Sequence, residues 1–240
     1  MANQPAKTPQ RAGFLQNRRA VRDEALSASV SIPIGRFALQ GDLEAPAGAT
    51  GVVLFAHGSG SSRQSPRNQF VARVLRDAGT ATLLFDLLTR AEEAADARDG
   101  HLRFNIGLLV ERLVAVTHWV ARQGAMQHFG LGYFGASTGG AAALVAAAEL
   151  GSAIDAVVSR GGRPDLAGAA LSRVKSPTLL IVGERDDVVR QLNEAAFAQL
   201  RCKKELAVVP RATHLFEEPG ALEEVAALAA AWFRRHLKPR

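Results

Sequence analysis

The chain has 240 residues, of which 48% are hydrophobic and 22% are charged, and its formal net charge is +6. This length and composition are typical of one large globular α/β domain with a substantial core. A single cysteine, Cys202, excludes an intramolecular disulfide, and the longest apolar runs are too short to span a bilayer. The polar N-terminus lacks the apolar core of a secretory signal peptide, so we expect a cytoplasmic protein.

The positive charge is concentrated at the two ends of the chain. Residues 1–25 carry five basic and two acidic side chains, and the last seven residues carry four basic ones, which leaves the body close to neutral. Basic tails can bind nucleic acid or anionic lipid. A single-strand binding platform also needs a series of interleaved aromatic residues, and the tails lack it. We therefore interpret residues 1–25 as a basic, flexible extension and residues 26–240 as one domain, and we expect no nucleic-acid partner.

The predicted elements begin with two strands that form an antiparallel hairpin, Ala28–Ile34 and Phe37–Glu44. From residue 51 onward, apolar runs with strand composition alternate with helical patterns. The predicted strands are Gly51–Ala56, Ala81–Phe85, Leu131–Phe134, Ala156–Ser159, Pro177–Val182 and Glu205–Val209. The predicted helices are 65–78, 102–123, 140–148, 165–174, 189–200 and 220–237. Residues 90–100 are charged and irregular, and we expect an exposed excursion there.

This alternation predicts a largely parallel sheet with helices on both faces. In such sheets the functional edge is where the strands end, so the loops after strands are the places to look for chemistry.

The sequence Gly135-Ala-Ser137-Thr-Gly139 lies between a predicted strand and a predicted helix. A G-x-S-x-G motif in this context is typical of a nucleophile elbow, in which a sharp turn exposes a serine in a strained conformation. The residues two before and two after the serine must then lack a Cβ. The alternative is an ordinary glycine-rich turn with a serine N-cap.

Two later loops supply partners for a serine nucleophile. Asp186 and Asp187 follow one predicted strand, and His214 follows the last. His214 would act as the general base and an aspartate would orient its imidazole. We favour Asp186 over Asp187, since one of the two can instead cap the next helix; Asp165 is a further alternative.

Backbone N–H groups of Thr138 and Ser59 are candidates for the oxyanion hole. Ser59 lies in the loop His57-Gly-Ser, and we interpret His57 as a structural residue that brings this loop to the oxyanion. Arg63 and Arg160, together with Arg67 and Arg163, lie in loops after strands and could bind an acidic acyl group. The alternative is that these arginines pair with loop carboxylates such as Asp86 and Asp165.

Five segments carry a resemblance to a known family: HGSGSSRQSPRN, FDLLT, GYFGASTGGAAAL, LLIVGERDDVV and ATHLFEEPGALEEVA. In this order they resemble the dienelactone hydrolase-like branch of the α/β-hydrolases, over residues 28–238. The resemblance implies an eight-stranded sheet, a Ser-Asp-His triad and no cofactor or metal. Dienelactone hydrolase itself uses a cysteine nucleophile whereas position 137 is serine, so its lactone substrate is not carried over. The segment between Ala156 and Pro177 is too short for a cap domain, which suggests an open site.

We therefore predict a serine hydrolase that cleaves an ester-type bond (carboxylic ester, thioester or lactone) of a small molecule. The open alternatives are an acyltransferase with the same triad and a non-catalytic binding protein on a hydrolase scaffold; a homodimer is also left open. A nucleotide site is not expected. Gly130-x-Gly132-x-x-Gly135 matches the dinucleotide pattern but runs through a predicted strand.

Overall fold

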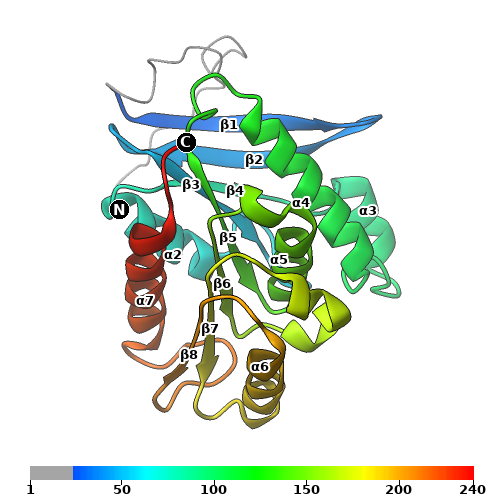
Figure 1. The fold of residues 1–240 in the computed structure, drawn as a ribbon. Helices are drawn as coiled ribbons and strands as arrows, with labels where there is room; N and C mark the ends of the chain where they lie inside the picture. The colour runs from blue at the N-terminus through cyan, green and yellow to red at the C-terminus, as the bar shows by residue number, and fades with distance from the viewer. Residues whose placement is uncertain (1–23) are drawn as a thin grey trace.

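The computed structural model describes residues 24–240, which form one eight-stranded sheet with the order β1-β2-β4-β3-β5-β6-β7-β8 (Figure 1). The hairpin strands β1 and β2 are antiparallel, β2 is also antiparallel to β4, and the remaining pairs are parallel. The strands are β1 (Leu26–Ile34), β2 (Phe37–Ala45), β3 (Gly51–Ala56), β4 (Ala81–Phe85), β5 (Gly130–Ala136), β6 (Ala156–Arg160), β7 (Thr178–Gly183) and β8 (Lys204–Val209). The predicted extension, residues 1–25, lies almost entirely outside the described residues.

Helices cover both faces of the sheet. On one face α2 (Pro66–Asp77) packs beside α7 (Ala221–His236). The other face is covered by α4 (Ile106–Ala121), α5 (Thr138–Leu150), the 3₁₀ helix η3 (Pro164–Arg173) and α6 (Asp187–Gln199). The predicted α/β-hydrolase fold, with its N-terminal antiparallel hairpin and mostly parallel sheet, is confirmed.

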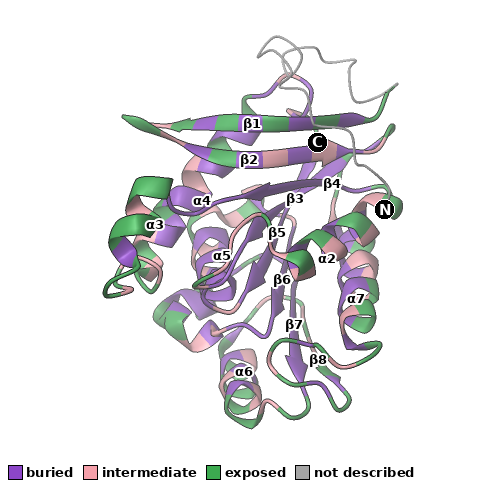
Figure 2. Cartoon of the chain, turned by 180° about the vertical axis from the view of Figure 1, so that it is seen from behind, coloured by how far each residue is buried: buried purple, intermediate pink, exposed green. Residues whose placement is uncertain are grey.

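The burial of each strand follows its place in the sheet (Figure 2). The central strands β3 to β7 are buried at every residue, because helices cover them on both sides. The outer strand β1 alternates buried and exposed residues, since only one of its faces meets the core. This contrast explains why the central strands read as continuous apolar runs in the sequence.

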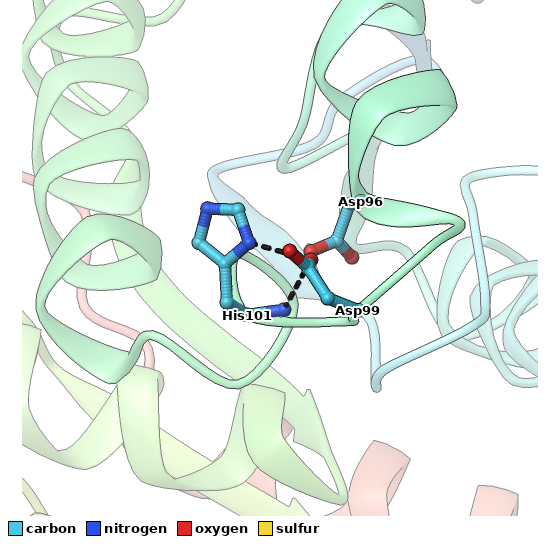
Figure 3. Close-up of side chains that lie close together, drawn as sticks. All are labelled: Asp96, Asp99 and His101. Carbon is cyan, nitrogen blue, oxygen red and sulfur yellow. Dashed lines mark hydrogen bonds and ion pairs between the residues drawn. The ribbon is translucent and has the colours of Figure 1, made fainter.

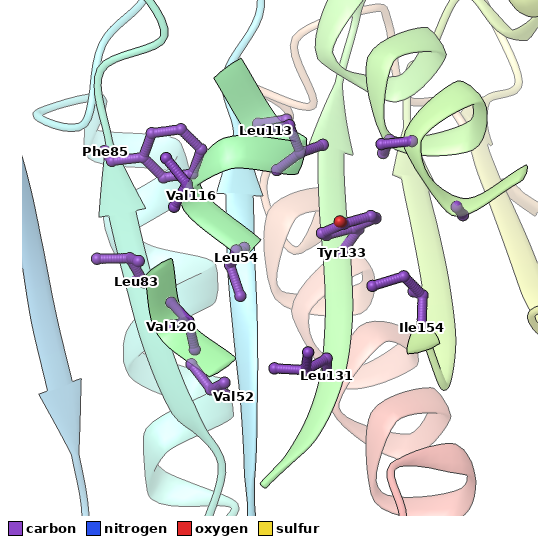
Figure 4. Close-up of a cluster of buried hydrophobic side chains, with 14 of the residues drawn as sticks. Val52, Leu54, Leu83, Phe85, Leu113, Val116, Val120, Leu131, Tyr133 and Ile154 are labelled. Carbon is purple, nitrogen blue, oxygen red and sulfur yellow. The ribbon is translucent and has the colours of Figure 1, made fainter. Parts of the chain in front are cut away.

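The core between the sheet and α4 is built from aliphatic side chains around Tyr133, the only tyrosine of the chain (Figure 4). The Tyr133 hydroxyl is fully buried and forms a 2.6 Å hydrogen bond with the hydroxyl of Thr117 on α4. Burial raises the pKa of Tyr133, so the phenol is neutral in the folded protein. This pair satisfies two polar groups that would otherwise destabilise the core.

Two predicted segments differ from the structure. Residues 90–100 were expected to be irregular, but α3 occupies Arg90–Asp96. Thr89 caps it: the Thr89 hydroxyl accepts from the Glu92 N–H, and the Glu92 carboxylate accepts from the Thr89 N–H. The Thr-x-x-Glu pattern is a sequence signature of a helix N-terminus, and it predicts α3 better than the charge pattern of residues 90–100 does.

The segment 165–174, predicted as an α-helix, forms η3, which is interrupted at Gly168 by non-helical backbone angles. Only η3 lies between β6 and β7, so no cap domain is inserted there. Within residues 24–240, none of the helices is both long enough and apolar enough to cross a membrane.

Candidate active site

Ser137 lies at the turn between β5 and α5 and has the backbone angles φ 51° and ψ −122°. A positive φ is rare for a residue other than glycine and marks local strain. The strain is held in place by hydrogen bonds. The Ser137 N–H donates to the Arg160 carbonyl, and the Ser137 carbonyl accepts from the N–H groups of Gly140 and Arg163. The structure thus gives Ser137 the geometry of a nucleophile elbow.

The two glycines of the motif are required by close packing. A Cβ added at Gly139 would lie 2.1 Å from the Ala56 carbonyl oxygen at the end of β3. A Cβ at Gly135 would lie 2.4 Å from the carbonyl oxygen of Gly139 itself. Both distances are far below van der Waals contact, so β3, β5 and α5 can meet at the serine only because these positions lack side chains.

His214 lies in the loop after β8, and its Nδ1 is 2.6 Å from Oδ2 of Asp186. The Asp186 side chain is 13% exposed and the His214 side chain 38%. A short bond to a largely buried carboxylate fixes the imidazole and leaves its Nε2 as the acceptor. The His214 ring also lies beside Gly161, where a Cβ would be 3.5 Å from His214 Cε1. Since Gly161 follows the residue that holds the Ser137 N–H, the histidine loop and the elbow meet at the same edge of the sheet.

The two neighbouring aspartates, Asp186 and Asp187, have different partners in the structure. Asp186 occupies the N-cap position of α6, yet its side chain makes no capping hydrogen bond and instead reaches His214. Asp187 is 74% exposed and lies 3.6 Å from Arg190 one turn along the helix. The alternative Asp165 forms two hydrogen bonds with Arg163. The geometry therefore favours Asp186, while its catalytic role stays a prediction.

His57, at the end of β3, is buried and uses both ring nitrogens. Its Nδ1 lies 2.9 Å from the Gly58 carbonyl and its Nε2 lies 3.0 Å from the Leu87 N–H. A carbonyl can only accept and an N–H can only donate, so the proton is on Nδ1. Burial lowers the pKa of His57, which keeps the ring neutral. His57 ties the loop after β3 to the loop after β4, as expected for a structural histidine.

Ser59 and Thr138, the residues predicted to supply the oxyanion-hole donors, lie next to each other in space. The Ser59 N–H donates to the Thr138 hydroxyl at 3.0 Å, which joins the loop after β3 to the first residue of α5. The Thr138 N–H is in the first turn of α5 and has no intrahelical acceptor. An oxyanion between them would share the Ser59 N–H with the Thr138 hydroxyl, an arrangement that the sequence did not indicate.

A cavity of about 560 Å³ adjoins the elbow. It is bounded by the loops after β3 and β4, by the first residues of α2 and α5, and by α3, with Ser59, Leu88, Arg67, Thr138 and Glu93 in its lining. The volume is within the range of small-molecule binding sites. Burial and the nearby charge of Asp86 raise the pKa of Glu93 in this wall.

Arg63, a predicted substrate ligand, is engaged within the protein. Its guanidinium forms an ion pair with Asp86 and lies 3.3 Å from Asp42, and its N–H donates to Asp86 at 2.8 Å. These contacts match the alternative expected from the sequence, pairing with loop carboxylates. Arg160, the other predicted ligand, is buried at the end of β6 without a carboxylate partner among the described residues.

One cluster away from the elbow has ligand atoms close enough together to hold a metal ion, namely Asp96, Asp99 and His101 (Figure 3). The buried carboxylate of Asp96 already accepts hydrogen bonds from the Leu102 N–H and from the backbone and side chain of Arg103. The exposed Asp99 and His101 pair with each other at 2.6 Å. The cluster closes the loop between α3 and α4.

The fold and the strained serine turn together define the α/β-hydrolase class. Comparison with known proteins agrees, since residues 49–227 match the family model described as an alpha/beta hydrolase domain. The chain belongs to the α/β-hydrolase family, in its dienelactone hydrolase-like branch.

Two solved structures illustrate this relationship. A dienelactone hydrolase from Anabaena variabilis ATCC 29413 is 59% identical, with a TM-score of 0.88, over 90% of this chain and 100% of that one. Est1E from Butyrivibrio proteoclasticus is 16% identical and shares the fold, with a TM-score of 0.72, over 86% of this chain and 98% of that one.

Two curated proteins from Mycobacterium tuberculosis strains are 55% identical over 217 residues and carry the name "Putative phosphoribosyl transferase". The match covers 90% of this chain but only 47% of those proteins. The chain thus spans about half the length of the curated relatives it matches.

Proposed function

We propose that this protein is a serine hydrolase that cleaves an ester-type bond of a small molecule through an acyl-enzyme. The observation that carries the proposal is the 2.6 Å bond between Asp186 and His214, in a loop that meets the strained elbow of Ser137. In a catalytic triad, a histidine base activates the serine nucleophile and a carboxylate orients the histidine. We propose a cytoplasmic location on the sequence alone.

The proposed chemistry assigns one role to each of these groups. His214 Nε2 takes the Ser137 proton as the serine oxygen attacks the carbonyl carbon of the substrate. Asp186 holds the imidazole by its Nδ1–H and stabilises the imidazolium. The N–H groups of Thr138 and Ser59 stabilise the oxyanion, and His214 then returns the proton to the leaving group. Water, activated by the same histidine, attacks the acyl-enzyme, releases the acid and restores Ser137.

The name of the curated relatives concerns proteins about twice as long as this chain, and we do not extend that activity to it. An acyltransferase remains the second candidate, because the same acyl-enzyme can pass its acyl group to an alcohol or thiol. Product analysis with added acceptors separates the two activities.

Labelling with a fluorophosphonate probe tests the nucleophile. We expect one covalent adduct by intact mass, absent in Ser137→Ala and retained in Ser61→Ala, a control serine that lines the same cavity. Circular dichroism should show that both variants are folded. A folded wild-type protein that forms no adduct would contradict the proposal and favour a non-catalytic binding protein.

A further inference from the structure

Four arginines are candidates for anion binding at this edge of the sheet, and three of them have carboxylate partners. The three pairs are Arg63 with Asp86, Arg67 with Glu217 and Arg163 with Asp165. Arg160 is the exception. It is only 7% exposed, and its Nε and Nη1 are buried with no hydrogen-bond partner among residues 24–240.

A buried charge without a counter-ion is costly, and proteins retain one chiefly where function requires it. Burial, together with the nearby positive charge of Arg67, lowers the pKa of Arg160 to about 10. At neutral pH the guanidinium is still protonated. The site therefore holds a cation whose Nε and Nη1 have no acceptor among the described residues.

Phe216 holds this guanidinium in place. The Arg160 Cζ lies 5.8 Å from the centre of the Phe216 ring, which is almost fully buried. Phe216 has a φ of 56°, a conformation that is unusual for an aromatic residue. The ring orients the cation but offers no hydrogen-bond acceptor, so Nε and Nη1 have no partner there.

Arg160 is tied directly to the reacting groups. Its carbonyl accepts the Ser137 N–H at 3.3 Å, and its neighbour Gly161 lies against His214. Along β6 its side chain shares a face with Val158, which belongs to the core beneath α2 and α7. It therefore lies on the α2 side of the sheet, close enough to Arg67 for their charges to interact. Arg67 lines the cavity and has a buried Nε that also lacks a partner.

We propose that Arg160, with Arg67 beside it, binds an oxyanion group of the substrate, a carboxylate or a phosphate, next to the bond that Ser137 attacks. The planar guanidinium matches the paired oxygens of either group. The substrate is thus an anionic ester, and this inference rests on the proposed hydrolase function. The competing role for Arg160 is purely structural, as a support for Phe216 and the loop of His214.

A titration that does not depend on turnover tests the anion site. Glutarate and inorganic phosphate are titrated by calorimetry into the wild-type protein, Arg160→Met and the control Arg163→Gln, whose arginine is already paired with Asp165. We expect saturable binding of at least one anion, weakened about tenfold or more in Arg160→Met and unchanged in the control. Tighter binding of phosphate assigns a phosphate-bearing substrate, and tighter binding of glutarate a carboxylate. Absence of saturable binding, or equal binding by Arg160→Met, overturns the proposal.

Kinetics on matched esters test the location of the anion site. Arg160→Met should lower kcat/KM for 4-nitrophenyl hemiglutarate by roughly 10- to 100-fold and for neutral 4-nitrophenyl pentanoate by less than about twofold. Arg160→Lys should restore part of the loss, since it keeps the charge but not the planar fork. Equal losses on both esters would show a structural role only and overturn the proposal. If the wild-type protein hydrolyses neither ester, the hydrolase proposal loses its support, while the titration still decides the anion site.

Discussion

The loops after β3 and β8 each bring a histidine to the catalytic edge of the sheet, and the two histidines have opposite surroundings. His57 is buried and both of its ring nitrogens are hydrogen-bonded to backbone groups. The His214 side chain is 38% exposed, and only its Nδ1 has a hydrogen-bond partner among the described residues. A general base needs an accessible lone pair, so the free nitrogen distinguishes the catalytic candidate from the structural one.

The loops that carry the two histidines also differ in how they are held: the contacts of the loop after β3 are more buried than those of the loop after β8. The loop after β3 is fixed by His57 and by Arg63, which reaches both Asp86 and Asp42. The loop after β8 is held by more exposed contacts, such as the Arg211 N–H to Glu184 and the Thr213 N–H to Glu218. The loop after β3 is thus the more firmly anchored of the two, whereas the loop after β8 depends on the bond from His214 to Asp186 and on the packing of Phe216.

Replacing His214 should have the largest effect on activity. His214→Gln is expected to lower kcat by about 10⁴-fold or more, because the base that activates Ser137 is lost. Its melting temperature should change little, since the side chain is part-exposed. Steady-state kinetics and thermal unfolding measure the two effects. A variant with near wild-type kcat would remove His214 from the mechanism.

The neighbouring aspartates provide the next largest effect. Asp186→Asn should reduce kcat by about 10³- to 10⁴-fold, because the amide no longer fixes the tautomer of His214. Asp187→Asn is the matched control, and we expect less than a twofold change because that carboxylate faces solvent. If the two variants behaved alike, the assignment of Asp186 would be wrong.

His57 should affect stability more than chemistry. His57→Gln is expected to reduce the free energy of unfolding by about 1–3 kcal/mol, because the buried Leu87 N–H and Gly58 carbonyl lose well-placed partners. Urea unfolding monitored by circular dichroism measures this change. A loss of activity as large as that of His214→Gln, without a loss of stability, would contradict the structural role.

The smallest expected effect is a pH dependence of stability. The pKa of His57 is lowered in the folded protein, so the unfolded chain takes up the proton more readily. The stability of the wild-type protein should therefore fall as the pH drops below about 6.5, the ordinary value for histidine, towards the lowered pKa of the folded state. The difference between wild type and His57→Gln, measured by urea unfolding at several pH values, isolates this contribution. A difference that does not vary with pH would show that the buried ring does not resist protonation.

The sequence alone determined the fold class and the order of the site residues. Continuous apolar runs predicted β3 and β4 with the bounds that the structure shows, and the glycines around Ser137 identified the turn. These features are readable because a strand buried on both faces and a turn that excludes Cβ atoms both constrain residue type locally. The capping box of α3 is equally local, because it depends only on Thr89 and Glu92.

Tertiary structure decided the rest. Asp186 and Asp187 are adjacent in sequence, and only the position of the His214 loop distinguishes them. Arg63 lies in the loop after β3 and Arg160 is the last residue of β6, and one meets two aspartates whereas the other meets the ring of Phe216. The role of each of these side chains depends on partners that lie far away in the chain, and only the folded sheet brings those partners together.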